Sequence, residues 1–225
     1  MKLRPSLIRQ HAQSGLTLVE LSIALVLTGT VLAALSMTTR QSRLLFEEQD
    51  LKVQIDVRSN RAAATVTKSL LPANSGNLVP DLTPIADAPK PWSDRLTFRA
   101  FEDFDGTSVV WSADRQLRWE LDPAEVRNGM DDDGDGLIDE GVLVWIEDEF
   151  GANSRRAVVA SSVAELLEGE QFNGIDDNGN GLIDEAGAAF ERDGNILTLH
   201  LTLEGMSPGG ALVQHTRRVR VQLRN

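Results

Sequence analysis

The chain contains no cysteine and no tyrosine among its 225 residues, and it has only three histidines. Without thiols, a disulfide framework and a thiolate-bound metal site are both excluded, and cysteine pairing cannot indicate the redox compartment. His11, His200 and His215 join no serine nucleophile and no metal-ligand set, and His200 alternates with leucines, so we expect it on the solvent side of a strand. We therefore expect a protein that is not an enzyme.

An excess of basic residues is also missing, because the formal net charge is −12. Lys2, Arg4 and Arg9 are the only Lys, Arg, Asp or Glu residues before Leu16, so a chain cut after Gly15 would carry −15. This balance argues against a phosphate-binding surface, and we expect no nucleic-acid partner. It suits an exported head or a protein that binds cations.

Charge is absent altogether between Leu21 and Thr39. Together with residues 16–20, this run is long enough to cross a hydrocarbon core of about 30 Å as a helix. The basic residues before it predict a cytoplasmic N-terminus and a head on the other side of the inner membrane. Glu20 is the exception, because an acid at the start of an apolar span is costly and indicates a partner or a task.

The residues around this acid read Ser14-Gly15-Leu16-Thr17-Leu18-Val19-Glu20. A cut after Gly15 would make Leu16 a cationic N-terminus that could pair with Glu20 of a neighbouring chain. This arrangement resembles the signal of type IV pilins and type II secretion pseudopilins. The resemblance implies cleavage by prepilin peptidase, N-methylation of Leu16, assembly directed by Glu20, and other pilins or pseudopilins as partners through the helix. It also implies the inner membrane first and an extracellular pilus or pseudopilus afterwards.

Two other interpretations fit the apolar run. An ordinary signal peptide could be cut after Val31-Leu32-Ala33, which would release a secreted calcium-binding adhesin or accessory protein. A plain membrane anchor would have the same hydropathy. Neither requires a glycine just before the run or an acid inside it.

The helix is expected to continue beyond the apolar run to about Leu71, where Pro72 ends it. One face is predicted from apolar residues at helical spacing: Leu44, Leu51, Ile55, Ala62, Val66 and Leu70. Two helices separated by a break near Arg40 are the alternative. The predicted organisation is a leader at 1–15, a transmembrane helix at 16–39, an amphipathic helix at 40–72 and a head at 73–225.

The head is expected to be rich in β-strands. Residues 73–92 have loop composition. Alternating or short apolar runs predict strands at 95–101, 108–112, 117–121, 142–146, 197–203 and 219–223. An antiparallel sheet covered by the amphipathic helix gives an α+β fold, which the pilin resemblance also implies. The last strand, ending Leu223-Arg224-Asn225, resembles the PilW family of minor pilins, to which the J-type pseudopilins are related in layout.

One acidic segment occurs twice. Residues 128–140 read NGMDDDGDGLIDE and residues 173–185 read NGIDDNGNGLIDE, with ten of thirteen positions identical. Two of the three changes exchange aspartate for asparagine, which keeps a side-chain oxygen. The alternative to a metal site is a pair of Asp/Asn-Gly turns that join strands.

The spacing of the oxygens predicts a calcium loop at each copy. Oxygens at alternate positions, a glycine and then a backbone carbonyl are the first positions of an EF-hand loop, but its final glutamate is missing. The segments resemble the shortened calcium loops of thrombospondin type 3 repeats, and Ile138 is expected to anchor the first. The candidate ligands are Asp131, Asp133, Asp135, Leu137, Asp139 and Glu140, and then Asp176, Asn178, Asn180, Leu182, Asp184 and Glu185.

Overall fold

The computed structural model describes residues 17–86 and 88–224. The chain divides into two units, residues 1–45 and residues 46–225, which are described separately. One helix, α1 (Leu18–Leu70), is continuous, as predicted, and the alternative of a break near Arg40 is absent from the described residues. The leader, with Gly15 and Leu16, lies outside the described residues.

In the first unit, the described residues form the N-terminal part of α1. Its apolar side chains are exposed, and this helix is long and apolar enough to cross a membrane. Its hydroxyl groups bond to the helix itself: Thr28 Oγ1 donates to the carbonyl of Ala24 at 2.7 Å, and Thr38 Oγ1 donates to that of Ala34 at 2.9 Å. Ser22, Thr30 and Thr39 bond to the helix in the same way, so these hydroxyl groups are satisfied without water, as a lipid environment requires.

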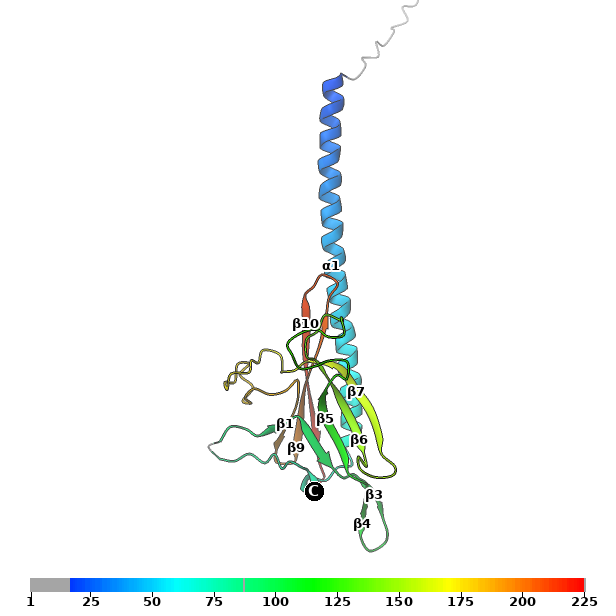
Figure 1. Ribbon diagram of the computed structural model, residues 1–225, viewed down its shortest axis with the longest axis vertical. Helices are drawn as coiled ribbons and strands as arrows, with labels where there is room; N and C mark the ends of the chain where they lie inside the picture. Colours follow the sequence, from blue (N-terminus) through cyan, green and yellow to red (C-terminus); the bar gives the residue numbers. More distant parts are fainter. Residues whose placement is uncertain (1–16, 87, 225) are drawn as a thin grey trace, which may run out of the picture. The chain divides into compact units, whose positions relative to one another are not determined.

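In the second unit, residues 46–70 of α1 cover one face of a sheet (Figure 1). The buried side of the helix is Ile55, Ser59, Ala62, Val66 and Leu70. Four members of the predicted face are buried, Ser59 is added, and the predicted Leu51 is only partly buried against the core. The helix ends one residue before the predicted Leu71. The predicted member Leu44, which belongs to the first unit, is exposed.

The helix packs closely against the sheet at Gly205. A Cβ atom there would come within 3.1 Å of Leu51 Cδ1 and 3.5 Å of Ile55 Cδ1. The first distance is tighter than ordinary van der Waals contact, so a side chain at this position would require Leu51 to shift by a few tenths of an ångström.

The sheet contains eight strands in the order β1-β8-β9-β7-β6-β5-β2, with β10 paired to β9, and every pairing is antiparallel. The α+β fold with a helix on an antiparallel sheet is therefore confirmed. The strands of this sheet are β1 (Trp92–Ser93), β2 (Arg95–Phe98), β5 (Arg115–Leu121), β6 (Gly141–Glu147), β7 (Arg155–Val163), β8 (Ala188–Asp193), β9 (Ile196–Met206) and β10 (Leu212–Gln222). A separate hairpin is formed by β3 (Phe101–Phe104) and β4 (Val109–Trp111).

The predicted strand at 95–101 is interrupted, because Ala100 leaves the ladder of β2 and its amide bonds to Ser112 Oγ at 2.9 Å. The chain then starts the hairpin β3–β4 instead of extending the large sheet. The loop at 73–92 contains a short 3-10 helix at Ser75–Asn77 and ends in β1. Strands β7 and β8 were not predicted, because neither alternates cleanly between apolar and polar residues.

The core lies between α1 and the sheet. Leu197, Leu199, Leu201 and Leu203 on β9 belong to it, together with Phe98, Leu117 and Phe190. The opposite side of β9 is also buried, at Thr198, His200, Thr202 and Glu204. The prediction that His200 faces solvent is therefore wrong, because the segment between β7 and β8, which carries the second acidic repeat, covers this side of β9 as a third layer. Glu168 shows this layer: its backbone amide donates to Thr202 Oγ1 at 3.1 Å, and its carboxylate accepts from Thr216 Oγ1 at 3.0 Å.

Candidate functional site

The first candidate site is the start of α1. Glu20 Oε2 accepts hydrogen bonds from the Thr17 amide at 2.9 Å and from Thr17 Oγ1 at 2.8 Å, and Thr17 Oγ1 lies 3.3 Å from the Glu20 amide that donates to it. This reciprocal pair is a capping box, which satisfies amides that have no partner inside the helix. The Thr-x-x-Glu spacing could have revealed Thr17 from sequence.

The two acidic loops are the second candidate site. The first loop, residues 128–140, joins β5 to β6, and the second loop, residues 173–185, joins β7 to β8. Glycines in both loops adopt positive φ at matching places, including Gly136 (φ 93°) and Gly181 (φ 90°). The repeated sequence therefore gives a repeated backbone, since only glycine adopts this conformation without strain.

The first loop brings its alternating aspartates together. Ligand oxygens of Asp131, Asp133 and Asp135 lie within 4.8 Å of one another. Asp131 accepts the amides of Gly134 at 2.6 Å and Gly136 at 3.0 Å, which fixes the turn around it. Three carboxylates held this closely favour a hard cation with oxygen ligands.

The carboxylate of Asp139 bonds to the backbone at the start of its own loop. Its two oxygens accept the amides of Asn128 at 2.9 Å and Gly129 at 2.8 Å, so this carboxylate closes the loop. In the second loop Asp184 does the same, accepting from Asn173 at 3.0 Å and from Gly174 at 2.8 Å. Asp139 (φ 51°) and Asp184 (φ 50°) share a left-handed backbone that directs the side chain back toward the loop start.

The loops are anchored by leucine. Leu137 and Leu182 are buried, and Ile138 is exposed. The prediction that Ile138 anchors the first loop is therefore wrong by one residue. After the turn at Gly136, the side chain of Leu137 points inward and that of Ile138 does not. An inward Leu137 side chain leaves its backbone carbonyl as the group that could serve a cation.

Sequence reasoning missed a buried glutamate upstream of each repeat. Glu125 is buried, and its Oε1 accepts the amides of Asp132 and Asp133 at 3.1 Å each. Its equivalent, Glu170, accepts the Asn178 amide at 2.9 Å. The signal was present, because a glutamate precedes the Asn-Gly pair by three residues in both copies.

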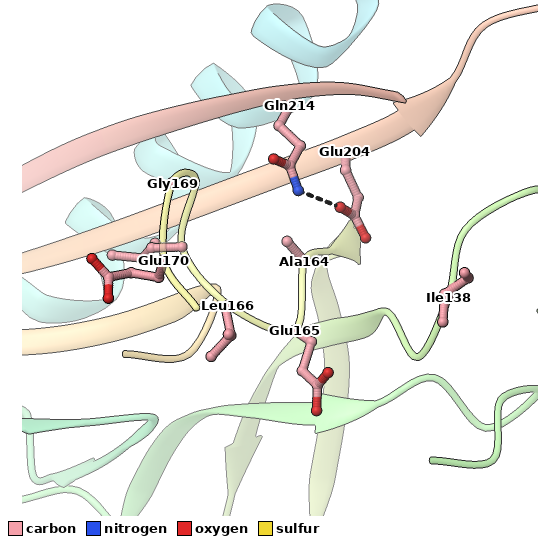
Figure 2. A pocket seen from close by; sticks show the side chains of 9 residues that line it. Ile138, Ala164, Glu165, Leu166, Gly169, Glu170, Glu204 and Gln214 are labelled. Atoms are coloured by element: carbon pink, nitrogen blue, oxygen red, sulfur yellow. Dashed lines mark hydrogen bonds between the residues drawn. The ribbon is translucent and has the colours of Figure 1, made fainter. Parts of the chain in front are cut away.

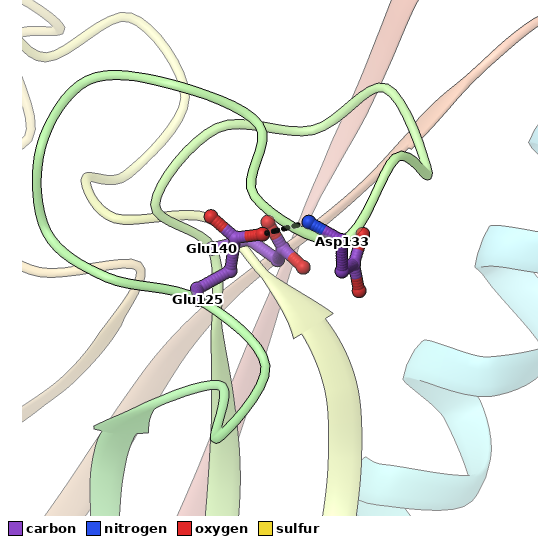
Figure 3. Close-up of side chains that lie close together, drawn as sticks. All are labelled: Glu125, Asp133 and Glu140. Atoms are coloured by element: carbon purple, nitrogen blue, oxygen red, sulfur yellow. Dashed lines mark hydrogen bonds between the residues drawn. The ribbon is translucent and has the colours of Figure 1, made fainter.

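Glu125, Asp133 and Glu140 form a cluster on the inner side of the first loop (Figure 3). One ligand oxygen from each lies within 4.8 Å of the others. Glu140 is only 3% exposed, and its Oε2 has no hydrogen-bond partner among the described residues. A buried carboxylate oxygen without a donor is costly, so this cluster could bind a metal cation. Glu170 and Glu185 in the second loop each have one such oxygen too.

The electrostatics agree with this geometry. Burial, and after it the neighbouring charges of Asp135, Glu125 and Asp133, raise the pKa of Glu140 to about 7. Burial also raises the pKa of Glu204, which lies close enough to the first loop to feel the charge of Asp135. In each case the ionised form lacks stabilisation that positive charge would supply.

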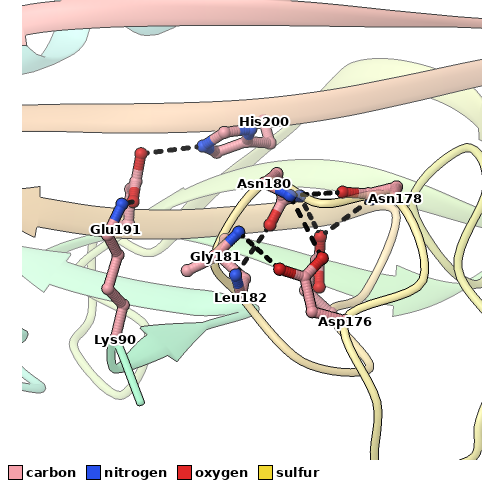
Figure 4. Close-up of polar contacts among 9 residues, drawn as sticks. Lys90, Asp176, Asn178, Asn180, Gly181, Leu182, Glu191 and His200 are labelled. Carbon is pink, nitrogen blue, oxygen red and sulfur yellow. Dashed lines mark hydrogen bonds and ion pairs between the residues drawn. The ribbon is translucent and has the colours of Figure 1, made fainter. Parts of the chain in front are cut away.

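The second loop lies over the outer side of β9 (Figure 4). Trp92 in β1 donates its indole N–H to the Ile183 carbonyl at 2.9 Å and so ties the loop to the sheet. Beside it, His200 Nε2 lies 3.0 Å from Glu191 Oε1, and Lys90 Nζ lies 3.8 Å from Glu191 Oε2. The buried His200 is thus paired with the Glu191 carboxylate and packs under the second loop.

A small pocket lies between the segments that carry the two loops (Figure 2). Ile138 contributes to it from the first loop, and Glu165, Leu166 and Glu170 contribute from the segment before the second. Glu204 also lines it and accepts a hydrogen bond from Gln214 at 2.8 Å. Its acidic lining would repel an anionic ligand.

The family model described as the prokaryotic N-terminal methylation motif matches residues 10–36 of the chain. Residues 10–36 therefore carry the N-terminal motif of type IV pilins and pseudopilins. The match covers the region of the predicted cleavage point, Glu20 and the apolar part of α1, and it does not extend to the head. No curated protein and no solved structure matches the chain. In this family, the motif implies processing by prepilin peptidase and a structural rather than an enzymatic role.

Proposed function

We propose that this pilin-family protein is a minor pilin or pseudopilin, a structural subunit of a type IV pilus or a type II secretion pseudopilus. Prepilin peptidase cuts it after Gly15, and Leu16 is then methylated. Residues 16–39 hold the subunit in the inner membrane until it enters the fibre, where its head contributes to assembly or to the tip surface.

The observation that carries this proposal is the methylation motif ending in an exposed apolar helix. Residues 18–39 are all exposed in the structure, so lipid or other helices must cover their side chains. Glu20 lies at the N-terminal turn of this helix, where the helix dipole favours a negative charge. An acid in that place is available to the amine of a neighbouring chain.

We further propose that calcium stabilises the head through the first loop. The support is the cluster of Glu125, Asp133 and Glu140 and the neighbouring triad of Asp131, Asp133 and Asp135. Calcium accepts six to eight oxygen ligands in flexible geometry, whereas magnesium prefers fewer protein ligands and retains water. The loop contains neither histidine nor cysteine, which disfavours zinc and copper.

The N-terminus of the mature protein tests the processing step. Sequencing by mass spectrometry should find a chain that starts at Leu16 and carries an added methyl group. A chain that starts at Ala34 would contradict the proposal and support a secreted calcium-binding adhesin or accessory protein.

The assignment as a minor subunit is tested by composition. Quantitative mass spectrometry of isolated fibres should find this protein far below the main subunit in amount, together with its fibre partners. Those co-purified partners also distinguish a pilus from a secretion pseudopilus. A fibre built mainly of this chain would contradict the minor role.

A further inference from the structure

The two acidic loops have the same backbone but opposite chemistry on their inner sides. Asp133 and Asp135 in the first loop are replaced by Asn178 and Asn180 in the second. In all four side chains, Oδ1 accepts the amide two residues further on, at 2.7–3.0 Å. The other terminal atom of each side chain, an oxygen in the first loop and an NH₂ group in the second, is thereby free to face the inside of the loop.

In the second loop, the two inner NH₂ groups meet a glutamate. Glu185 is fully buried, and its Oε1 accepts from Asn178 Nδ2 at 3.2 Å and also from Asn180 Nδ2 (Figure 4 shows both asparagines). Its Oε2 has no partner among the described residues, as in Glu140, so the loops differ in the two donors to Oε1 and not in this second oxygen. Hydrogen bonds from neutral donors can stabilise a buried carboxylate without an ion. Lys90 adds positive charge at the edge of the second loop. Its Nζ lies beside Gly181, where an added Cβ atom would be 3.4 Å from it.

In the first loop, the same inner positions are oxygens. Asp133 faces Glu125 and Glu140, and the Glu140 Oε2 atom meets no donor among the described residues (Figure 3). The side chain next to the turn also differs between the loops. Gly136 in the first loop lies against Met206, whose Cγ would be 2.9 Å from an added Cβ atom, and methionine carries no charge, unlike Lys90 beside Gly181. Nothing described near this loop replaces the amide donors of the second loop.

We propose that the first loop binds one divalent cation between Glu125, Asp133 and Glu140, whereas the second loop binds none, because Asn178 and Asn180 donate the hydrogen bonds that replace it. The chain therefore holds one cation and one self-closed copy of the same loop. This inference rests on the calcium site proposed above. It adds the number of bound ions and names the residues that determine which loop binds one.

The test counts calcium in the full-length protein purified in detergent. After equilibrium dialysis at millimolar calcium, elemental analysis should find one ion per chain. The double variant Asn178→Asp/Asn180→Asp gives the second loop the inner side chains of the first, and it should bind two. The reciprocal variant Asp133→Asn/Asp135→Asn should bind none and still melt cooperatively, because its amides can donate to Glu140.

The outcomes separate this inference from the calcium proposal. Two ions in the wild-type protein would overturn the division between the loops and leave the calcium site standing. No ion in the wild-type protein would overturn both. A count that stays at one in Asn178→Asp/Asn180→Asp would show that these asparagines do not decide binding, which also overturns the inference.

Discussion

Replacing Glu140 by glutamine should have opposite effects on stability in the absence and in the presence of calcium. In the cation-free protein, burial and then the charges of Asp135, Glu125 and Asp133 raise the pKa of this carboxyl group from 4.5 to about 7. The folded state therefore binds more protons than the unfolded state between these two values, and stability falls as the pH rises through them. At about 1.4 kcal/mol per pKa unit, ionised Glu140 costs about 3 kcal/mol at pH 8.

Glutamine removes this charge and keeps the shape of the side chain. With chelator at pH 8, Glu140→Gln should raise the melting temperature of the full-length protein by roughly 6–12 °C, at about 2–4 °C per kcal/mol for a domain of this size. The difference between variant and wild type should disappear below pH 4.5, where the carboxyl group is protonated in both states. With calcium at about 100 times its dissociation constant, the wild type should gain about 2.7 kcal/mol and the variant much less.

Differential scanning calorimetry in detergent, with chelator and with calcium across pH 4–8, measures these shifts. The matched control is Glu185→Gln in the second loop, where the new side-chain oxygen can still accept from both asparagine amides, so a small change independent of calcium is expected. If Glu140→Gln lowered the melting temperature equally with and without calcium, Glu140 would be a packing residue, and the argument for unmet charge would be wrong.

Three further predictions concern the helix and the sheet. Leu70→Ala should cost about 2–5 kcal/mol in chemical denaturation because it leaves a cavity between α1 and the sheet, whereas Val57→Ala on the exposed side should cost less than about 1 kcal/mol. Gly187→Ala should lower the melting temperature markedly, because the new Cβ atom would lie 1.8 Å from the Ala164 carbonyl oxygen, and a normal melting curve would contradict that close approach. Glu20→Ala should abolish incorporation into isolated fibres, and Thr17→Ala, which removes only the Oγ1 part of the capping box, should reduce helix stability by about 1 kcal/mol while fibres still form.

The fold could be predicted from sequence where the signal was periodic and long. The apolar spacing along residues 51–70 gave the buried side of α1, and the alternating leucines of β9 gave its core side. Strands β7 and β8 escaped prediction because their residues do not alternate. His200 was misplaced because alternation reports that two sides of a strand differ, and it does not report whether a distant loop covers the polar side.

The candidate site could be predicted only in part, for a similar reason. The repeat located both acidic loops, and the alternating aspartates of the first do converge. Glu125 and Glu170 were missed because they precede the calcium-loop pattern, although they recur in both copies. Asp139 and Asp184 bond to backbone amides because the backbone is left-handed at these residues. The spacing of oxygen ligands in the sequence does not predict such a turn.

The burial of both sides of β9 links the first loop to the sheet, and this link leads to a prediction for hydrogen exchange. Gly136 packs against Met206 at the end of β9, and burial together with Asp135 raises the pKa of Glu204. Removing calcium leaves the inner carboxylates of the first loop in mutual repulsion, so the loop should open locally and expose this end of the strand.

Mass-resolved exchange should therefore show faster exchange with chelator in residues 125–140 and 204–206. The second loop and residues 197–200 are the internal control, because asparagine amides hold that loop closed. Equal acceleration in both loops would contradict the division between them. Faster exchange along the whole of β9 would show instead that the cation stabilises the entire head.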